Sequence, residues 1–578
     1  MCGTCGLRVG AKLPGRVVLA ESWVRCASGV MGPGSAWRCA GGVMGPGSAW
    51  QCAGWTSDTR CGTPVGREGE GMKVNIGYWV SKNARLYPDK NALICAGRSV
   101  TYRELDRRVN RLANALADMG LVAGDRVAAM MLNSIEYVEL LFACAKKGLV
   151  FVPLNFRLSV PELQFILDDC TPRALFFDPV FDRQAGTLGT SVPSLVLRTA
   201  VPLAGGGEYD ALLERWPETE ALDERHGGDD LLLIMYTAGT TGRAKGVMLS
   251  HHNCFFQTIN GWAFGNSPDA VTLVVLPLFH VGGLNGSVTP MIHIGATTIL
   301  IPKFDPADVL ELVERWKVVG IMAVPTVYQM LLDHPDFGRR DLPSLEVLLS
   351  GGAPLPHALL EAYDARGFEM RQGYGLTEAS PGVTGMGPGD CRRKPGTVGK
   401  RCLYTEVEVM DDEGRILPPG QTGEVVARGP NIMLGYWNLP EETAKTIVDG
   451  WLRTGDLGHF DEDGFLTIAG RKKEMIISGG ENVYPAEIEQ ILTNHPDVGM
   501  AAVVGIKDPM WGEVPVAFVT PAPGSTPVPE AILEYLGPRL ARYKIPRTVY
   551  VRDVLPISAA GKILKRQLVE ELSAPQRQ

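Results

Sequence analysis

The sequence has no long hydrophobic run, no excess of basic charge and few cysteines over most of its length. A membrane-spanning helix needs roughly 20 consecutive apolar residues, and no run approaches that length. The 578 residues carry a formal net charge of −8, which argues against a nucleic-acid partner held by bulk electrostatics. We therefore expect a cytoplasmic protein with no nucleic-acid partner and no transmembrane segment. A peripheral membrane contact and a homodimer stay open.

Six of the twelve cysteines lie in the first 71 residues, a segment that differs in composition from the rest. It also contains four of the eleven tryptophans and two copies of GVMGPGSAW. Two copies are too few for a stacked repeat, and Cys2 and Cys5 have no second pair at metal-binding spacing. Residues 1–71 are predicted to be a disordered, low-complexity extension from an upstream start codon, with Met72 as the natural start. A redox or metal-binding tail is the alternative.

From Met72 onward, short apolar runs of strand length alternate with segments of helical periodicity. Residues 125–133 (DRVAAMMLN) predict a buried strand, and residues 134–148 predict a helix. Further strand-like runs are VFVPLN, ALFFD, LLLIMYT, VTLVVLPL, ATTILIP and VVGIMAVP. The chain is too long for one core, and strands buried on both faces between helices predict α/β layers with largely parallel sheets. Ligands of such sheets bind at the carboxyl ends of the strands.

One loop that follows such a strand is rich in glycine, threonine and positive charge. Residues 236–253 read YTAGTTGRAKGVMLSHHN, directly after the apolar run LLLIM. Glycines let backbone N–H groups approach a ligand closely, threonine hydroxyls add donors, and Lys245 supplies a point charge that suits a phosphate. The loop lacks the GKS or GKT ending of a Walker P-loop. We predict a phosphate-binding loop, with a glycine-rich surface hairpin as the alternative.

Four later blocks accompany this loop: RQGYGLTEASP, GWLRTGDLG, GRKKEMIISGGENVYPAEIE and LPISAAGKILKRQL. In this order, the five blocks resemble the adenylate-forming superfamily of acyl-CoA synthetases, luciferases and peptide-synthetase adenylation domains. The resemblance covers essentially Met72 to the C-terminus. It implies a large AMP-binding domain of layered, largely parallel α/β sheets at residues 72–469. A small, mobile α+β domain follows at residues 470–578.

The resemblance implies an acid–thiol ligase of the AMP-forming acyl-CoA synthetase type. ATP and a carboxylate would give an acyl-adenylate and pyrophosphate, and the thiol of coenzyme A would then displace AMP. Because the first step joins two anions, Mg²⁺ and cationic side chains must neutralise charge and hold the reactants in line. The implied partners are thus a carboxylic acid, ATP, Mg²⁺ and coenzyme A.

The resemblance also assigns roles to residues of the large domain. The β- and γ-phosphates are expected to meet Thr237, Gly239, Thr240, Thr241 and Gly242, with Lys245 assisting. Ala238 stands where relatives mostly carry serine, so one hydroxyl donor is missing. Glu378 is the expected Mg²⁺ ligand, with a carboxylate at a helix start as its alternative. The other nucleotide contacts are expected from Gly351, Gly352, Ala353 and Tyr374 at the adenine, Thr377 at the α-phosphate, and Asp456 and Arg471 at the ribose.

Further roles fall in the small domain. Lys562 is expected to swing into the site and bind the carboxylate and the α-phosphate during adenylation, where it stabilises developing charge. Lys473 falls at the hinge, and rotation then places Gly480 at the pantetheine tunnel. Trp511 is expected at this tunnel or in the core. The coenzyme A nucleotide is expected to contact Tyr543, Lys544 and Arg547. The alternative is that these residues form an ordinary basic helix end.

The acid itself is predicted from the segment LPLFHVGGLNG at residues 276–286, which is expected to line the acyl pocket. His280 either gates entry or is a satisfied core histidine, and Gly282, Gly283 and Gly286 leave room. The segment carries no acidic anchor for an amino-acid ammonium group. We therefore expect an apolar acid, first a medium- or long-chain fatty acid, with an aryl or alicyclic acid as the alternative. A luciferase-like adenylating oxygenase shares the same motifs.

Overall fold

The computed structural model describes residues 74–203, 205–237, 243–261, 267–479, 481–557 and 563–573, together with two short strands nearer the N-terminus. The chain divides into two compact units, Met1–Gly69 and Glu70–Gln578. In the first unit, β1 (Arg38–Cys39) pairs antiparallel with β2 (Gly42–Val43). The prediction for residues 1–71 otherwise concerns residues outside the described part of the chain.

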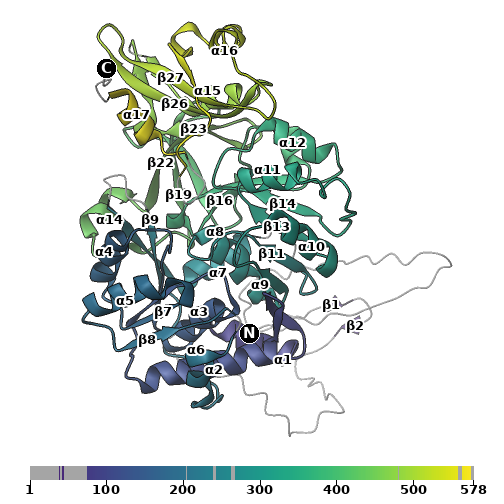
Figure 1. The fold of residues 1–578 in the computed structure, drawn as a ribbon, viewed down its shortest axis with the longest axis vertical. Coiled ribbons are helices and arrows are strands. Elements are labelled where there is room, and N and C mark those ends of the chain that lie inside the picture. Colours follow the sequence, from purple (N-terminus) through teal and green to yellow (C-terminus); the bar gives the residue numbers. More distant parts are fainter. Residues whose placement is uncertain are drawn as a thin grey trace, which may run out of the picture. The chain divides into compact units, whose positions relative to one another are not determined.

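The first sheet of the second unit, of which Figure 1 labels β7, β8 and β9, is parallel in its centre and antiparallel at one edge. Its strand order is β20-β10-β9-β6-β5-β7-β8. The strands are β5 (Arg126–Met130), β6 (Val150–Pro153), β7 (Ala174–Phe177), β8 (Leu197–Ala200), β9 (Leu231–Thr237), β10 (Lys245–Ser250) and β20 (Gly435–Tyr436). The helices of this region are α1 (Tyr78–Leu86), α2 (Tyr102–Asp118), α3 (Ile135–Lys147), α4 (Val160–Cys170), η1 (Pro179–Phe181), α5 (Asp182–Ser191), α6 (Gly207–Glu214) and α7 (His251–Asn260).

The second sheet has the order β17-β16-β15-β14-β13-β11-β12-β3-β4, and its run from β15 to β3 is parallel. The strands are β3 (Asn91–Cys95), β4 (Arg98–Thr101), β11 (Val271–Val274), β12 (Thr297–Leu300), β13 (Gly320–Ala323), β14 (Val347–Ser350), β15 (Met370–Gly375), β16 (Gly382–Gly385) and β17 (Lys400–Arg401). The helical segments are α8 (Val281–Gly283), the π-helical turn η3 (Leu284–Val288), α9 (Thr289–Ile294), α10 (Pro306–Trp316), α11 (Pro325–Asp333), α12 (His357–Asp364), η4 (Thr377–Ala379) and α13 (Asp390–Arg393).

Two smaller sheets complete the chain. The third is antiparallel and contains β18 (Glu406–Met410), β19 (Gly423–Arg428), β21 (Ile447–Val448), β22 (Trp451–Phe460) and β23 (Leu466–Arg471), with α14 (Pro440–Thr446) before β21. The C-terminal sheet is mixed and contains β24 (Ile476–Ser478), β25 (Glu481–Val483), β26 (Val498–Asp508), β27 (Gly512–Pro521) and β28 (Val549–Val551). The accompanying helical segments are η5 (Lys472–Glu474), α15 (Pro485–Leu492), α16 (Pro529–Leu536), η6 (Arg542–Lys544) and α17 (Lys565–Ser573).

The α/β prediction is confirmed: a large region of mainly parallel sheets precedes a smaller α+β region. β5 falls within residues 125–133, and α3 falls within residues 134–148. The inner parallel strands of the first and second sheets are nearly fully buried on both faces, as parallel strands between helices require. The proposed domain boundary between residues 469 and 470 falls within β23 and stays a prediction. The mobility of the small domain likewise stays a prediction.

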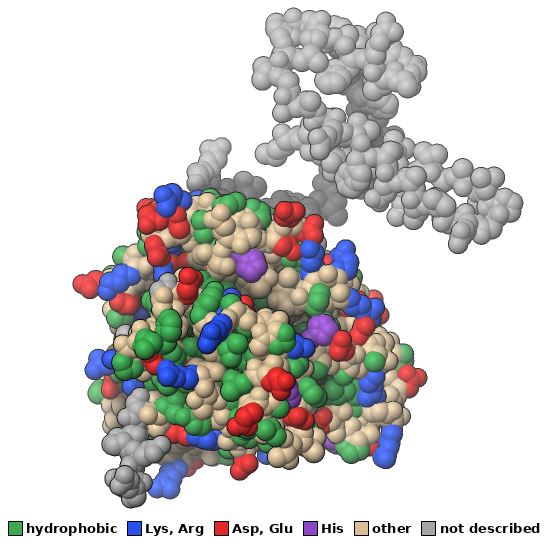
Figure 2. Space-filling model, turned by 90° about the horizontal axis from the view of Figure 1, so that it is seen from above, with side chains coloured by type: hydrophobic (Ala, Val, Ile, Leu, Met, Phe, Trp, Pro, Cys, Tyr) green, Lys and Arg blue, Asp and Glu red, His purple; other side chains and the backbone are tan. Residues whose placement is uncertain are grey.

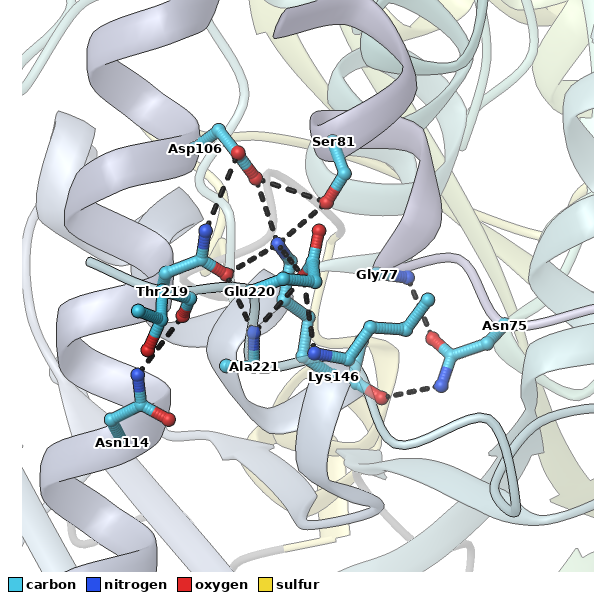
Figure 3. A network of polar contacts seen from close by, with 12 residues as sticks. Asn75, Gly77, Ser81, Asp106, Asn114, Lys146, Thr219, Glu220 and Ala221 are labelled. Atoms are coloured by element: carbon cyan, nitrogen blue, oxygen red, sulfur yellow. Dashed lines mark hydrogen bonds and ion pairs between the residues drawn. The ribbon is translucent and has the colours of Figure 1, made fainter. Parts of the chain in front are cut away.

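A fully buried lysine joins α1, α2 and α3 (Figure 3). The Lys146 Nζ lies 2.7 Å from both Ser81 Oγ and Asp106 Oδ1. It also lies 2.6 Å from Asn110 Oδ1 and 2.9 Å from Glu220 Oε1. A buried charge is costly unless it is paired and hydrogen-bonded, and both conditions are met here. The network therefore ties the three helices to the segment that contains Glu220.

The described helices include none that is long and apolar enough to span a membrane. On the face shown in Figure 2, basic and acidic side chains are interspersed among hydrophobic and other residues. This mixed surface agrees with the modest net charge of −8. It offers no continuous basic field on that face, which is the usual footprint of a nucleic-acid site.

Candidate active site

The predicted phosphate loop joins two paired strands of the first sheet. β9 ends at Thr237 and β10 begins at Lys245, and these two residues are partners in the antiparallel pair. Because β9 also runs parallel to β6, Thr237 lies at a carboxyl-terminal edge, where α/β sheets bind ligands. Five members of the loop lie outside the described residues: Ala238, Gly239, Thr240, Thr241 and Gly242.

The first turn of α7 anchors β10 to the segment that leads into β20. Ser250 caps α7: its hydroxyl accepts from Asn253 N at 3.1 Å, and Asn253 Oδ1 accepts from Ser250 N at 2.8 Å. The Asn253 amide nitrogen donates to Pro430 O at 2.9 Å and to Ile432 O at 2.7 Å. The capping box therefore fixes the helix start, and the amide nitrogen of Asn253 holds the segment that leads into β20, which pairs with β10 and ends at Tyr436.

A chain of contacts links Lys245 to Glu378 through Tyr436, a residue that the sequence analysis did not identify. The Lys245 Nζ lies 5.0 Å from the centroid of the Tyr436 ring, and the Tyr436 hydroxyl donates to Glu378 Oε1 at 2.8 Å. Lys245 also forms a 2.8 Å ion pair with Glu442 Oε2 on α14, while Lys445 pairs with the other oxygen at 3.0 Å. The hydrogen bonds from Lys245 and then Lys445 lower the pKa of Glu442 to about 2.

The carboxylate of Glu378 is suited to a hard cation. Its Oε1 accepts from Tyr436, and no basic side chain in the described part of the chain forms an ion pair with it. The described residues contain no group of three or more His, Cys, Asp or Glu that could hold a metal by themselves. Mg²⁺ does not need such a cage, because it commonly binds one or two carboxylates together with substrate phosphates and water. The residues present therefore fit Mg²⁺ delivered with a nucleotide.

The predicted adenine wall lies where β14 and β15 end side by side. Gly351 follows β14 directly, and a Cβ placed on it would lie 3.5 Å from the Gly373 carbonyl oxygen in β15. Gly352 has a φ of +78°, a left-handed conformation that favours glycine. Ala353 follows in the same turn. Backbone conformation favours glycine at Gly352, whereas a Cβ at Gly351 would make only an ordinary van der Waals contact.

Asp456 joins the second sheet to the third. Only 4% of this residue is exposed, and its Oδ2 accepts from the Tyr374 hydroxyl at 2.6 Å. Its Oδ1 forms a 2.8 Å ion pair with Arg471 Nε, which faces it across β22 and β23. Burial, together with the Asp456 charge, raises the pKa of Tyr374 well above its ordinary value, so the phenol stays a donor. Three of the predicted nucleotide residues therefore meet, and Thr377 begins η4 just beyond the end of β15.

The predicted acyl segment, residues 276–286, contains α8 and the start of the π-helical turn, which continues into α9. His280 precedes α8 and is half-buried, and its ring centroid lies 4.5 Å from that of Phe279. A Cβ on Gly283 would lie only 2.3 Å from the Pro277 carbonyl oxygen. Glycine at this position is therefore required by the local backbone, and not simply by the space that a substrate needs. Its substrate role, like that of His280, stays a prediction.

Met322 of β13 lies between the acyl segment and the adenine wall. A Cβ on Gly286 would lie 3.2 Å from Met322 Sδ, and a Cβ on Gly351 would lie 3.8 Å from Met322 Cε. The two predicted sub-sites are therefore neighbours across one flexible side chain. Neither Met322 nor Tyr436 was found from the sequence, because strand pairing and packing between distant segments bring them to the site.

In the small domain, Gly480 and Lys562 lie outside the described residues. Lys473 is exposed in η5, directly after β23. Trp511 is 51% exposed, which excludes the alternative that it is a core residue. A Cβ on Gly479 would lie 2.7 Å from Trp511 Cε3, so the indole covers the residue that precedes Gly480.

The basic residues considered for the coenzyme A nucleotide already have acidic partners in the small domain. Lys544 Nζ lies 2.8 Å from both oxygens of Glu487, and Arg547 pairs with Asp508. Tyr543 is 40% exposed beside them. A nucleotide phosphate would have to share or replace these carboxylates. Their role in coenzyme A binding stays a prediction.

Comparison with known proteins identifies related enzymes. The model of the AMP-binding enzyme family matches residues 80–437, and that of the AMP-binding enzyme C-terminal domain matches residues 487–562. A feruloyl-CoA synthase of Amycolatopsis is 43% identical over 85% of this chain and 98% of its own. An indoleacetate–CoA ligase of Aromatoleum aromaticum is 40% identical over 86% and 98%. A long-chain-fatty-acid–CoA ligase of Mycobacterium tuberculosis is 38% identical over 86% and 99%.

Solved structures agree with these relatives. The anthranilate CoA ligase AuaEII in complex with anthranoyl-AMP superposes with a TM-score of 0.81 at 29% identity, over 87% of this chain and 98% of that one. The o-succinylbenzoate CoA synthetase of Bacillus subtilis with ATP and magnesium gives a TM-score of 0.74 at 33% identity, over 85% and 98%. With ATP and coenzyme A as substrates and Mg²⁺ accompanying the nucleotide, the chain belongs to the AMP-binding enzyme family and is an acid–thiol ligase of the AMP-forming acyl-CoA synthetase type.

Proposed function

We propose that this ligase activates an apolar carboxylic acid that carries an aromatic ring and converts it into its coenzyme A thioester. The observation that carries this proposal is the identity of 43% and 40%, over nearly the whole of both partners, with enzymes named for feruloyl-CoA and indoleacetate–CoA formation. The fatty acid that the sequence led us to expect first is supported by the long-chain-fatty-acid–CoA ligase, a relative with a lower identity of 38%. The relatives therefore favour the aryl alternative over the fatty acid.

The surroundings of the acyl segment support a ring-bearing substrate. Phe279 is nearly buried, and its ring meets Phe156 edge-on at 5.1 Å and His280 at 4.5 Å. Aromatic rings prefer such edge-to-face and tilted arrangements, which an additional ring can extend. The segment also lacks an acidic or basic anchor, as an apolar acid requires.

In the adenylation step, the acid carboxylate attacks the α-phosphorus of ATP, an acyl–phosphate bond forms, and pyrophosphate leaves. We assign the β- and γ-phosphates to Lys245, Thr237 and the loop residues Gly239, Thr240, Thr241 and Gly242. The nucleotide is assigned to Gly351, Gly352, Ala353 and Tyr374 at the base, Thr377 at the α-phosphate, and Asp456 and Arg471 at the ribose. Asp456 can accept from the ribose while it keeps its present partners, because a carboxylate has about four lone-pair sites.

Glu378 would hold Mg²⁺, which neutralises phosphate charge when it is bound with the nucleotide. Lys562 is assigned to the carboxylate and the α-phosphate during adenylation. In the second step, the thiol attacks the acyl carbonyl, the acyl–oxygen bond breaks, and AMP leaves. Lys473 is assigned to the hinge, and Gly480 and Trp511 to the pantetheine path.

A panel of matched acids tests the substrate class. The purified enzyme would receive ATP, Mg²⁺ and coenzyme A with ferulate, indole-3-acetate, 3-phenylpropanoate, 3-cyclohexylpropanoate, octanoate or palmitate. We expect AMP, pyrophosphate and the thioester, with kcat/KM at least tenfold higher for the aromatic acids than for octanoate and palmitate, which corresponds to about 1.4 kcal/mol. The phenyl and cyclohexyl pair separates ring chemistry from ring size.

Other outcomes of this panel would contradict the proposal in distinct ways. Higher kcat/KM for octanoate or palmitate would show that the preferred substrate is a fatty acid, as the sequence first led us to expect. Release of ADP and inorganic phosphate would exclude the adenylate route. Oxygen-dependent light emission with a luciferin, without thioester formation, would identify the luciferase-like alternative.

A further inference from the structure

The carboxylate of Glu442 lies between two lysines that differ in solvent exposure. Its Oε2 is 2.8 Å from the Nζ of Lys245, whose side chain is only 16% exposed. Its Oε1 is 3.0 Å from the Nζ of Lys445, whose side chain is 68% exposed. Glu442 and Lys445 share α14, whereas Lys245 begins β10. One acidic group thus contacts both the inner lysine of the phosphate loop and an outer lysine in solvent.

The inner position is where a nucleotide phosphate would need its counter-charge. Like charges repel strongly at contact distance, so a phosphate and the Glu442 carboxylate do not share Lys245 without cost. Lys445 lies three residues after Glu442 on one helix, a spacing at which side chains are neighbours. The carboxylate therefore has a second partner when Lys245 turns to another anion.

We propose that Glu442 is an internal counterion that occupies Lys245 before ATP binds and is displaced onto Lys445 by the incoming phosphate. This inference rests on the proposed phosphate role of Lys245. Glu442 is a positioning residue, because it acts on the nucleotide through Lys245.

Tyr436 contacts both Lys245 and Glu378 and so maintains their relative position during this exchange. Its ring lies 5.0 Å from Lys245 Nζ, and its hydroxyl is tied to Glu378 at 2.8 Å. A cation over an aromatic face keeps part of its stabilisation when its carboxylate partner changes. Lys245 therefore needs only to exchange one anion for another, while its position relative to Glu378 is retained.

Calorimetric titration of MgATP into the full-length protein, without acid or coenzyme A, tests this inference. We expect Glu442→Gln to bind MgATP about two- to fivefold more tightly than the wild type, since a partly exposed ion pair no longer competes. Glu441→Gln is the matched control. It removes the same charge from the adjacent position of α14, and within the described residues Glu441 forms no ion pair. Lys445→Gln should weaken binding about twofold, because Glu442 loses its second partner.

Equal affinity changes in Glu442→Gln and Glu441→Gln would overturn the inference, since they would reduce the effect to general charge. Weaker MgATP binding by Glu442→Gln would overturn it too. If that variant does not fold, Glu442→Asp, which keeps the charge on a shorter side chain, should shift affinity in the same direction. The proposed function fails separately, when MgATP binds but no aromatic acid is activated. Absence of MgATP binding by the wild type would overturn both.

Discussion

At the scale of single residues, His251 shows how burial sets the protonation of a side chain. This first residue of α7 is fully buried, and its Nδ1 accepts a hydrogen bond from Ile76 N at 3.2 Å. An imidazole that accepts at this nitrogen must be unprotonated there. Burial, opposed in part by the charge of Asp230, lowers the pKa of His251 from 6.5 to about 3.

Stability should therefore fall as the pH decreases through the weakly acidic range. The folded pKa lies below the unfolded one, so the contribution is complete above about pH 6.5 and is lost as the pH falls toward 3. Between pH 6.5 and 5, one such group costs about 2 kcal/mol. His251→Asn, whose Oδ1 can accept from Ile76 without titrating, should reduce this loss. Thermal unfolding midpoints at pH 7 and pH 5 measure it, and equal pH dependence in both proteins would contradict the prediction.

Not every residue of the site could be predicted from the sequence. Glu378, Asp456 and Lys245 belong to contiguous motifs with a characteristic order, so the sequence points to them directly. Tyr436 and Glu442 reach Lys245 only because β20 pairs with β10, and such a pairing between distant segments has no local pattern. Gly283 was predicted for the space it leaves, whereas the structure shows a close approach to Pro277.

At the scale of elements, the Lys146 network holds the first helices in place. Lys146 has no exposed side-chain surface, and its partners come from α1, α2 and the segment at Glu220 (Figure 3). Apolar packing alone is compatible with several arrangements of these helices. A buried ammonium group is more restrictive, because it needs its partners at hydrogen-bond distance. The network thus contributes specificity as well as attraction.

Lys146→Met keeps the length of the side chain and removes its charge, which leaves Asp106 and Glu220 without their cation. Loss of one partner of a buried pair costs about 3–5 kcal/mol, and we expect about 2–3 kcal/mol here because Glu220 is half exposed. The thermal midpoint should fall by several degrees. Lys147→Met is the control, since no described residue forms an ion pair with Lys147. Equal midpoints for the two variants would show that the network does not contribute to stability.

Elements with several buried residues were predicted better than short ones. The strand within residues 125–133 was found because its apolar run is continuous, although β5 itself covers only Arg126–Met130. The two-residue strand β20 is too short for any periodicity to appear. The π-helical turn at Leu284–Val288 was also missed, because its Asn285-Gly286 pair is typical of a turn and not of a continuing helix.

At the scale of the whole molecule, we propose that one small domain has two tasks. Lys562 is proposed for adenylation and Gly480 for thioester formation, and both lie outside the described residues. Their described neighbours differ: Ile563 pairs with Ile557 in an isolated β-bridge, whereas Gly479 lies beneath Trp511. We predict that the two residues act from different surfaces of the domain, which cannot both face a single site at once. The two half-reactions should therefore require two arrangements.

Substitutions in the two segments should damage different steps. Lys562→Ala should slow adenylate formation by about two to three orders of magnitude, because it removes one charge partner of the transition state. It should spare thioester formation from pre-made acyl-AMP. Gly480→Leu should have the opposite effect, since its side chain obstructs the thiol path. Single-turnover rates of each half-reaction measure both. Equal losses in both steps for both variants would exclude the two-arrangement mechanism.

The π-helical turn between α8 and α9 has a genetic consequence. A π turn accommodates one residue more than an α turn, and α8 continues through it into α9. Because the wide turn absorbs its extra residue, deletion of one codon within Leu284–Val288 would let it close to an α-helical turn while the preceding segment and α9 keep their helical phase. A one-residue deletion within a regular α-helix such as α2 instead rotates everything before it by about 100°. A three-base deletion should therefore be tolerated better in this turn than in the regular helices of the chain.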